Sequence, residues 1–172
     1  MFSIHPIIHT PTYANARPKV EDYRPGYPRF TALISEHSPY LLCRSFKRLR
    51  ARILLFKQDK LCQLESKLDI LDKDEKCAFF LSSVRRDRNS DRRALMSEIE
   101  VCLADYGQFI HRTNRTLSLD TPAHRDIEAL NNWVDGNATI TTAETAYLKP
   151  AYERDLLSLA PSRDSAIVQL ET

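Results

Sequence analysis

The chain has 172 residues, of which 42% are hydrophobic and 28% charged, and its formal net charge is +2. This length and composition are typical of one globular domain and exclude a disordered or membrane-embedded chain. The small net charge gives no reason to expect nucleic acid as a partner, and three glycines are too few for a β-barrel or a phosphate-binding loop.

Nothing in the cysteine pattern indicates a metal or a cofactor. The four cysteines are Cys43, Cys62, Cys77 and Cys102, and their spacing is neither that of a zinc site nor that of a redox pair. We expect them to be reduced, which together with the lack of a secretory signal predicts a cytoplasmic protein. No stretch approaches the roughly 20 apolar residues of a transmembrane helix, so we expect a soluble protein.

Prolines interrupt the first 29 residues, at Pro6, Pro11, Pro18, Pro25 and Pro28. Each removes a backbone donor and restricts the residue before it, which prevents a helix. We therefore expect an extended, proline-rich arm over residues 1–25 and a single helical domain over residues 26–172.

The next segments predict a short helix at residues 30–37 and a long one at about residues 41–74. The long segment lacks Gly and Pro, and its apolar residues recur every three or four positions, which indicates an amphipathic helix of about 50 Å. Residues 75–90 are ambiguous, with an apolar run at residues 77–81 and a charged stretch at residues 85–91. A second long helix begins near Ser90, which we take as its N-cap. Its apolar face is expected to contain Leu95, Ile99, Cys102, Leu103, Tyr106 and Ile110.

Shorter helices are expected in the last third of the chain. Thr121 and Pro122 form an N-cap with proline at the first helical position, and this helix is predicted to stop at Gly136. Residues 141–144 have the pattern of a capping box, so another helix is expected before Pro150. Residues 152–159 and 164–170 add one or two more. The predicted fold is all-α: an irregular helical bundle with two long antiparallel helices and three to four short ones, without strands.

The order of these residues resembles a family of fungal proteins of unknown function, DUF6594. The resemblance covers about residues 25–170 and rests on several segments: Gly26 to Phe30; Phe46; Leu49 to Arg52; Leu54-Leu55; Gln58-Asp59; Leu64-Glu65; Leu68; Leu71-Asp72; Tyr106; Leu117; Asn132-Trp133; Glu144 to Leu156; and Leu159 to Pro161. It implies a fungal origin and a helical fold. Family members continue into hydrophobic C-terminal helices that look membrane-spanning, and we expect this chain, which ends at Thr172, to lack that part. The resemblance supplies no catalytic residues.

Two groups of residues are candidates for a ligand pocket. Gln58 and Asp59 lie mid-helix among apolar residues, with Arg52 on the same face as Asp59; they could orient a ligand or form a buried polar network. His111, Tyr106 and Trp133 could converge to line a small-molecule pocket, or be core residues with polar tips at the surface.

A basic run begins the long helix, with Arg44, Lys47, Arg48, Arg50, Arg52 and Lys57. It could contact an anionic ligand or a membrane surface, or be a solvated helix face.

Three functions follow from these observations. No nucleophile with a base and an orienting group is visible, but a pericyclic cyclisation needs little more than a shaped apolar cavity. The first hypothesis is a pocket protein of fungal secondary metabolism, a cofactor-independent cyclase of the Diels–Alder type acting on an apolar terpenoid or polyketide. The second is an interaction module that pairs through its long helix, for example as a homodimer, with an exposed leucine stripe over residues 61–71. The third is a peripheral membrane protein that uses the basic segment.

Overall fold

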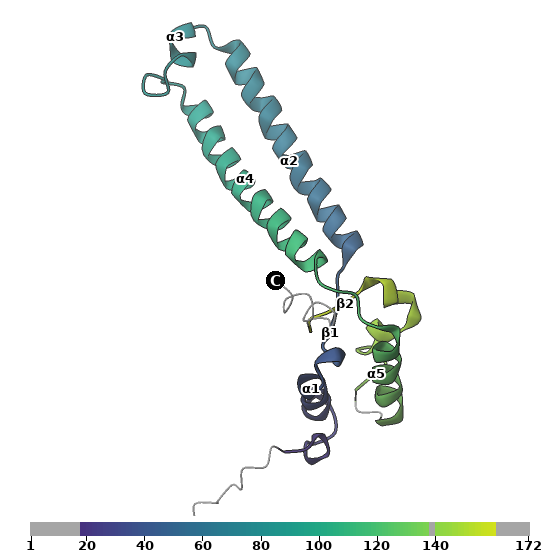
Figure 1. Ribbon diagram of the computed structural model, residues 1–172. Helices are drawn as coiled ribbons and strands as arrows, with labels where there is room; N and C mark the ends of the chain where they lie inside the picture. Colours follow the sequence, from purple (N-terminus) through teal and green to yellow (C-terminus); the bar gives the residue numbers. More distant parts are fainter. Residues whose placement is uncertain (1–17, 138–139, 161–172) are drawn as a thin grey trace, which may run out of the picture.

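The computed structural model describes residues 18–137 and 140–160, and this part of the chain is mostly α-helical, as predicted. The helices are α1 (Tyr27–Glu36), α2 (Lys47–Asp74), α3 (Ala78–Leu81), α4 (Ser90–Leu117) and α5 (His124–Asn137); the strands are β1 (Leu42–Arg44) and β2 (Leu156–Ser158). Short 3-10 segments are η1 (Val20–Asp22), η2 (Ser38–Tyr40), η3 (Ala146–Leu148) and η4 (Pro150–Asp155). Two parts are evident in Figure 1: a long hairpin of α2 and α4 with α3 at its tip, and a small head that contains α1, α5 and the strands.

The hairpin is a two-stranded antiparallel coiled coil. Each of its helices has 28 residues, which corresponds to about 42 Å. Apart from Asp72, the α2 side chains that are at least partly buried are Arg50, Leu54, Lys57, Leu61, Leu64, Leu68 and Leu71. Those of α4 are Arg92, Leu95, Ile99, Cys102, Tyr106, Phe109, Thr113 and Thr116. Both series alternate steps of three and four residues, which is the pattern of heptad positions a and d facing a partner helix.

The head has its own apolar core. Phe30 and Leu33 of α1 pack with Leu130 and Val134 of α5 and with Leu148 of η3. The two strands form an antiparallel pair in which Cys43 lies opposite Leu157. Because Leu156 and Leu157 are buried, the strand pair also contributes to the interior at the point where the hairpin leaves the head.

The predicted start of the long helix was wrong. Residues 42–44 form β1, and α2 begins only at Lys47, after Phe46 adopts the left-handed conformation with φ of 52°. The chain must turn sharply here because β1 pairs with a strand more than 110 residues away. The apolar periodicity of a local segment cannot predict such a long-range strand pairing.

The predictions for the last third of the chain were partly wrong. Residues 152–159 form the end of η4 and then β2 rather than a helix, and the segment after Thr141 forms only the 3-10 turn η3. Thr141 Oγ1 donates to the side chain of Glu144, at 2.9 Å from Oε2, whereas a capping box pairs each of these two side chains with a backbone N–H. The N-cap of α4 is Asn89 rather than Ser90, and α5 spans residues 124–137 instead of 122–136. The proline-rich arm up to residue 17 and the helix expected at residues 164–170 lie outside the described residues.

Candidate functional site

The structure brings together two of the predicted pocket residues, Gln58 and Tyr106. Gln58 Nε2 donates a hydrogen bond of 3.0 Å to Tyr106 Oη across the hairpin. Asp59 instead accepts a 2.7 Å bond from Gln63 Nε2 on its own helix, and Arg52 is exposed. The polar group around residue 58 is therefore a local link between α2 and α4.

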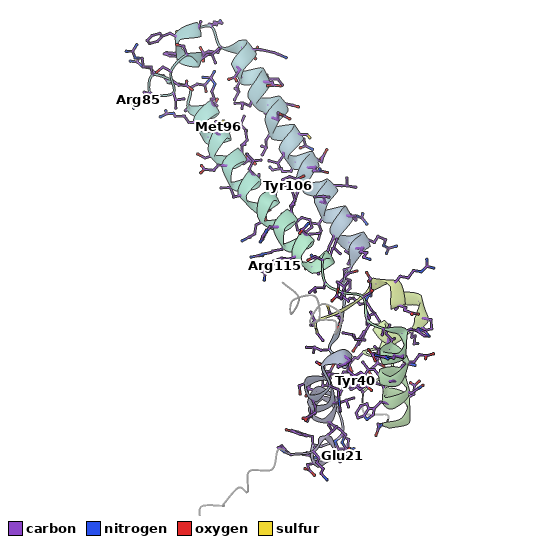
Figure 2. All side chains as sticks on the ribbon, viewed as in Figure 1. Glu21, Tyr40, Arg85, Met96, Tyr106 and Arg115 are labelled. Atoms are coloured by element: carbon purple, nitrogen blue, oxygen red, sulfur yellow. The ribbon has the colours of Figure 1, made fainter. Side chains whose placement is uncertain are left out.

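Tyr106 and Trp133 lie in different parts of the molecule. Trp133 packs in the head against Phe30, with the ring centroids 6.3 Å apart, whereas Tyr106 lies midway along the hairpin (Figure 2). His111 is exposed on α4. Tyr106 and Trp133 each lie on the apolar face of their own helix, but α5 packs against α1 and η3 in the head. The prediction for His111 was wrong, because this residue is on the side of α4 opposite the seam with α2.

An open hollow of about 320 Å³ lies on the hairpin, lined by Lys67, Ile70, Leu71 and Leu95. It is bordered by α2 and α4 towards their distal ends. None of the predicted pocket residues lines this hollow.

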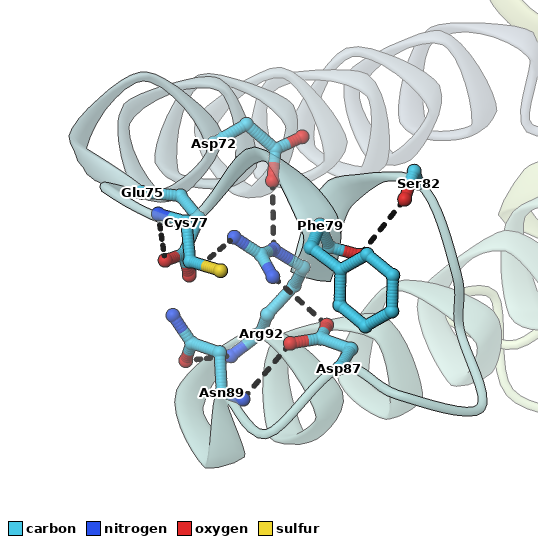
Figure 3. A network of polar contacts seen from close by, with 8 residues as sticks. All are labelled: Asp72, Glu75, Cys77, Phe79, Ser82, Asp87, Asn89 and Arg92. Atoms are coloured by element: carbon cyan, nitrogen blue, oxygen red, sulfur yellow. Dashed lines mark hydrogen bonds and ion pairs between the residues drawn. The ribbon is translucent and has the colours of Figure 1, made fainter.

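A buried arginine closes the distal end of the hairpin (Figure 3). Arg92 is 8% exposed, and its guanidinium pairs with Asp72 at 2.8 Å, Asp87 at 2.8 Å and Glu75 at 3.3 Å. It thereby joins the end of α2, the tip loop and the first turn of α4. Asn89 completes the group by accepting a 3.0 Å bond from the Arg92 N–H.

These contacts shift the pKa values of the groups involved. The hydrogen bond from Arg92 lowers the pKa of Asp87, and the backbone N–H of Cys77, followed by Arg92, lowers that of Glu75. Asp87 in turn raises the pKa of Arg92. Because Arg92 is paired with three carboxylates, the group acts as a clamp on the hairpin tip rather than as a reactive centre.

A stripe of apolar residues that are about half exposed runs along α4. We define the α4 stripe as Met96, Leu103, Ile110 and Leu117, which are 48%, 53%, 42% and 41% exposed. They are spaced seven residues apart and occupy heptad position e, directly beside the a/d seam. Figure 2 shows Met96 and Tyr106 along the same helix.

The opposite edge of the seam carries charged residues instead of apolar ones. Position g of α4 carries Asp91, Glu98, Asp105 and Arg112, all charged. Lys60 pairs with Glu98, and Lys57 pairs with Asp105. Charged pairs of this kind flank the seam of a two-stranded coiled coil where it faces water. Only the e edge of α4 is apolar, so the two edges of the hairpin are chemically distinct.

The sequence shows part of this stripe as apolar residues of the second long helix. The predicted helix places Leu103 and Ile110 on the same face as Leu95 and Ile99. In the structure they are at position e, beside that face. The leucine stripe expected over residues 61–71 of α2 is not a separate exposed surface, because Leu61, Leu64, Leu68 and Leu71 face α4 inside the hairpin.

The match to a known family covers both parts of the fold. The family model DUF6594, a family of unknown function, matches residues 27–171. The chain belongs to this family. The searches of curated proteins and of solved structures found no match. Within residues 18–137 and 140–160, no helix has the length and apolar character required to cross a membrane.

Proposed function

We propose that the chain is a protein-interaction module whose hairpin docks an amphipathic helix of a partner along the α4 stripe. The observation that carries this proposal is the apolar character of position e on α4. A two-stranded coiled coil needs an a/d seam alone, whereas apolar residues at a, d and e are typical of a helix in a larger bundle. The described chain supplies two helices to this rod, and a partner would supply the rest.

The stripe is large enough to contribute to binding. Complete burial of an exposed Leu, Ile or Met side chain is worth about 1.5–3 kcal/mol, and the four stripe residues are each about half exposed. Covering them would contribute on the order of 1 kcal/mol each. The ion pairs on the other edge of the hairpin would remain in water, which confines docking to one side.

The cyclase stays a prediction that has less geometric support. Its pocket was expected to be lined by Tyr106 and Trp133, which lie in different parts of the molecule, and the hollow beside Ile70 is open. The stripe, in contrast, has an apolar residue at every seventh position from Met96 to Leu117.

Site-specific photo-crosslinking in cells tests the interaction module. A photoreactive amino acid at Leu103 is expected to form a discrete crosslinked product. The same probe at Gln108, which is exposed at position c on another side of α4, is the matched control. The product at residue 103 should disappear when Ile110→Asp is added. Equal crosslinking at residues 103 and 108, or none at either, would contradict the proposal.

A membrane surface is a second candidate, and it is favoured by the base of α2. Leu49, Ile53 and Phe56 are 52%, 45% and 78% exposed, and Arg48 and Arg52 are exposed beside them. Apolar residues flanked by basic ones are typical of helices that lie on anionic membranes. Salt-sensitive cosedimentation with phosphatidylserine vesicles, lost in Phe56→Asp and kept in Leu103→Asp, would support it.

A further inference from the structure

We infer that the tip of the hairpin inserts its apolar side chains into an anionic lipid bilayer. This contact goes beyond the interaction module, because the α4 stripe runs along the side of the hairpin, whereas the tip lies at its far end (Figure 1). It also differs from the membrane candidate at the base of α2, which lies at the opposite end of that helix. Three features of the tip support it: exposed apolar residues, unpaired cationic residues and a fixed shape.

The tip loop, residues 76–90, presents apolar side chains to water. Val84 is 93% exposed, and Phe79 and Leu81 are each about half exposed. The N–H groups of Arg86 and Asp87 both donate to the Ser83 carbonyl at 3.0 Å. Val84 and Arg85 therefore occupy the outer corners of a turn, where a valine side chain is free to enter an apolar phase.

The tip loop is also cationic. Its exposed cationic side chains are Lys76, Arg85, Arg86 and Arg88. Asp87 is its only carboxylate, and this group is nearly buried and paired with Arg92. Among the described residues, none of the four cations forms an ion pair. The loop thus carries unpaired positive charge at its surface, which favours an anionic partner.

The apolar and cationic side chains lie on the same surface. The Arg86 guanidinium lies over the Phe79 ring, 4.8 Å from its centroid, so the turn is in contact with α3. Val84 directly precedes Arg85, which Figure 2 places at the distal end of the hairpin. Arginines in such a position keep their charge among lipid phosphates while their apolar neighbours enter the boundary of the acyl chains.

A bilayer fits this surface better than a protein does. A stable protein interface buries about 800 Å² on each partner, whereas the tip offers three apolar side chains on one turn and on the four-residue helix α3. A lipid surface needs no complementary shape. Each arginine near an anionic leaflet also strengthens binding by about five-fold. Small apolar area and unpaired charge together therefore favour anionic lipid as the occupant.

The clamp around Arg92 fixes the shape of the tip loop. Arg92 pairs with Asp72 and Glu75 at one end of the loop and with Asp87 at the other (Figure 3). The Asn89 N–H donates a 2.9 Å bond to Asp87 Oδ1. The loop is therefore ordered in the free chain, and binding carries little cost for immobilising it.

Vesicle cosedimentation provides the first test. The full chain is expected to bind vesicles of phosphatidylcholine and phosphatidylserine, and to bind phosphatidylcholine alone much more weakly. Val84→Asp should weaken binding by about ten-fold or more. Val101→Asp, at an exposed valine midway along α4, is the matched control and should bind like the wild type. Failure of the wild type to bind, or equal binding by the two variants, would overturn the inference.

A pair of arginine variants tests whether the charge acts at the tip. Arg85→Gln and Arg115→Gln each remove one positive charge, at opposite ends of the hairpin (Figure 2). Arg85→Gln should weaken vesicle binding by about five-fold, and Arg115→Gln should leave it unchanged. Equal losses would mean that net charge, rather than the tip, drives binding. If Phe56→Asp abolishes binding and Val84→Asp does not, the base of α2 is the contact, and the inference is wrong.

Tryptophan quenching by brominated phosphatidylcholine, mixed with phosphatidylserine, tests insertion. The chain's single tryptophan, Trp133, lies in the head, so the wild type should not be quenched. Val84→Trp is expected to be quenched, whereas Val101→Trp should behave like the wild type. Equal quenching of the two variants would indicate a hairpin that lies flat on the bilayer. That result, or no quenching of Val84→Trp on bound vesicles, would overturn insertion by the tip.

This inference and the interaction module fail separately. The crosslink at Leu103 tests the α4 stripe, and vesicle binding by the Val84 variants tests the tip. A chain that crosslinks at Leu103 and does not bind anionic vesicles retains the interaction module and loses the membrane contact. A chain that binds through Val84 and gives no crosslink at Leu103 shows the reverse.

Discussion

Ser45 donates its hydroxyl hydrogen to Asp155 Oδ1, and this contact links residues 110 positions apart in the chain. The same carboxylate accepts a 2.9 Å bond from Arg44 Nε and a 3.4 Å bond from the Lys47 N–H. The Asp155 carbonyl accepts a 2.7 Å bond from the Ser45 N–H. Because Ser45 is fully buried, this residue pair anchors the first turn of α2 to the head.

Asp155→Ala is expected to destabilise the protein by about 1–3 kcal/mol, because it leaves the buried Ser45 hydroxyl without this acceptor. Partial burial raises the pKa of Asp155, but the bonds from Ser45, Arg44 and Lys47 together outweigh it, and the pKa lies below its ordinary value. Urea unfolding measures the loss. Asp69→Ala, at an exposed position of α2, should change stability by no more than about 0.5 kcal/mol.

The clamp around Arg92 is expected to make the hairpin tip sensitive to acid. The pKa values of Asp87 and Glu75 are lowered in the fold, so their stabilising contribution is present above the ordinary values near 4. It is lost as the pH falls through the lowered values. Hydrogen exchange should show residues 72–92 losing protection before the head does on acidification.

Arg92→Met should lower the hydrogen-exchange protection of residues 72–92 at neutral pH, because it leaves three carboxylates without their common partner. Arg93→Met, at the exposed neighbouring position, should leave their exchange unchanged. Equal protection of the tip in both variants at neutral pH would show that the clamp does not hold it.

His124 is expected to show the opposite pH dependence. The hydrogen bond to Glu153 Oε1, followed by the charge of Glu128, raises its pKa. The contact therefore stabilises the fold below the ordinary value of about 6.5, and this contribution is lost as the pH rises through the raised value. NMR titration of the imidazole measures the shift. Glu153→Gln should move the pKa back towards the ordinary value.

Leu64→Ala should cost about 2–5 kcal/mol, because Leu64 is fully buried in the middle of the seam and truncation leaves a cavity. Thermal unfolding provides the measurement. Val101→Ala, on the exposed side of the same hairpin, is the control and should shift stability by about 0.5 kcal/mol or less. Equal losses for the two variants would mean that the seam does not hold the hairpin together.

Gly107→Ala is expected to stabilise the hairpin. A Cβ at this position in the middle of α4 meets nothing within 4 Å in the chain, so alanine should raise the free energy of unfolding by about 0.5–1 kcal/mol. Thermal unfolding measures the gain, and an unchanged or lower stability would contradict the prediction.

The two long helices could be predicted because their apolar residues recur every three or four positions within one continuous segment. The strands could not, since Leu42 and Ser158 pair across most of the chain and neither three-residue strand has a pattern of its own. For the candidate site, the sequence indicates both Gln58 and Tyr106, in two separate groups, but it also groups Trp133 with Tyr106. Helix periodicity gives the face of each helix, not the neighbour that this face contacts.

The short connection between the head and α2 has a mechanical consequence. Only Ser45 and Phe46 separate β1 from α2. Ser45 forms two hydrogen bonds with Asp155, so the hairpin cannot rotate about β1 without breaking them. Because α2 and α4 are each about 42 Å long, the hairpin is a spacer of fixed length. A molecule held by the exposed Phe79 and Leu81 at the tip would be kept at that distance from anything that contacts the head.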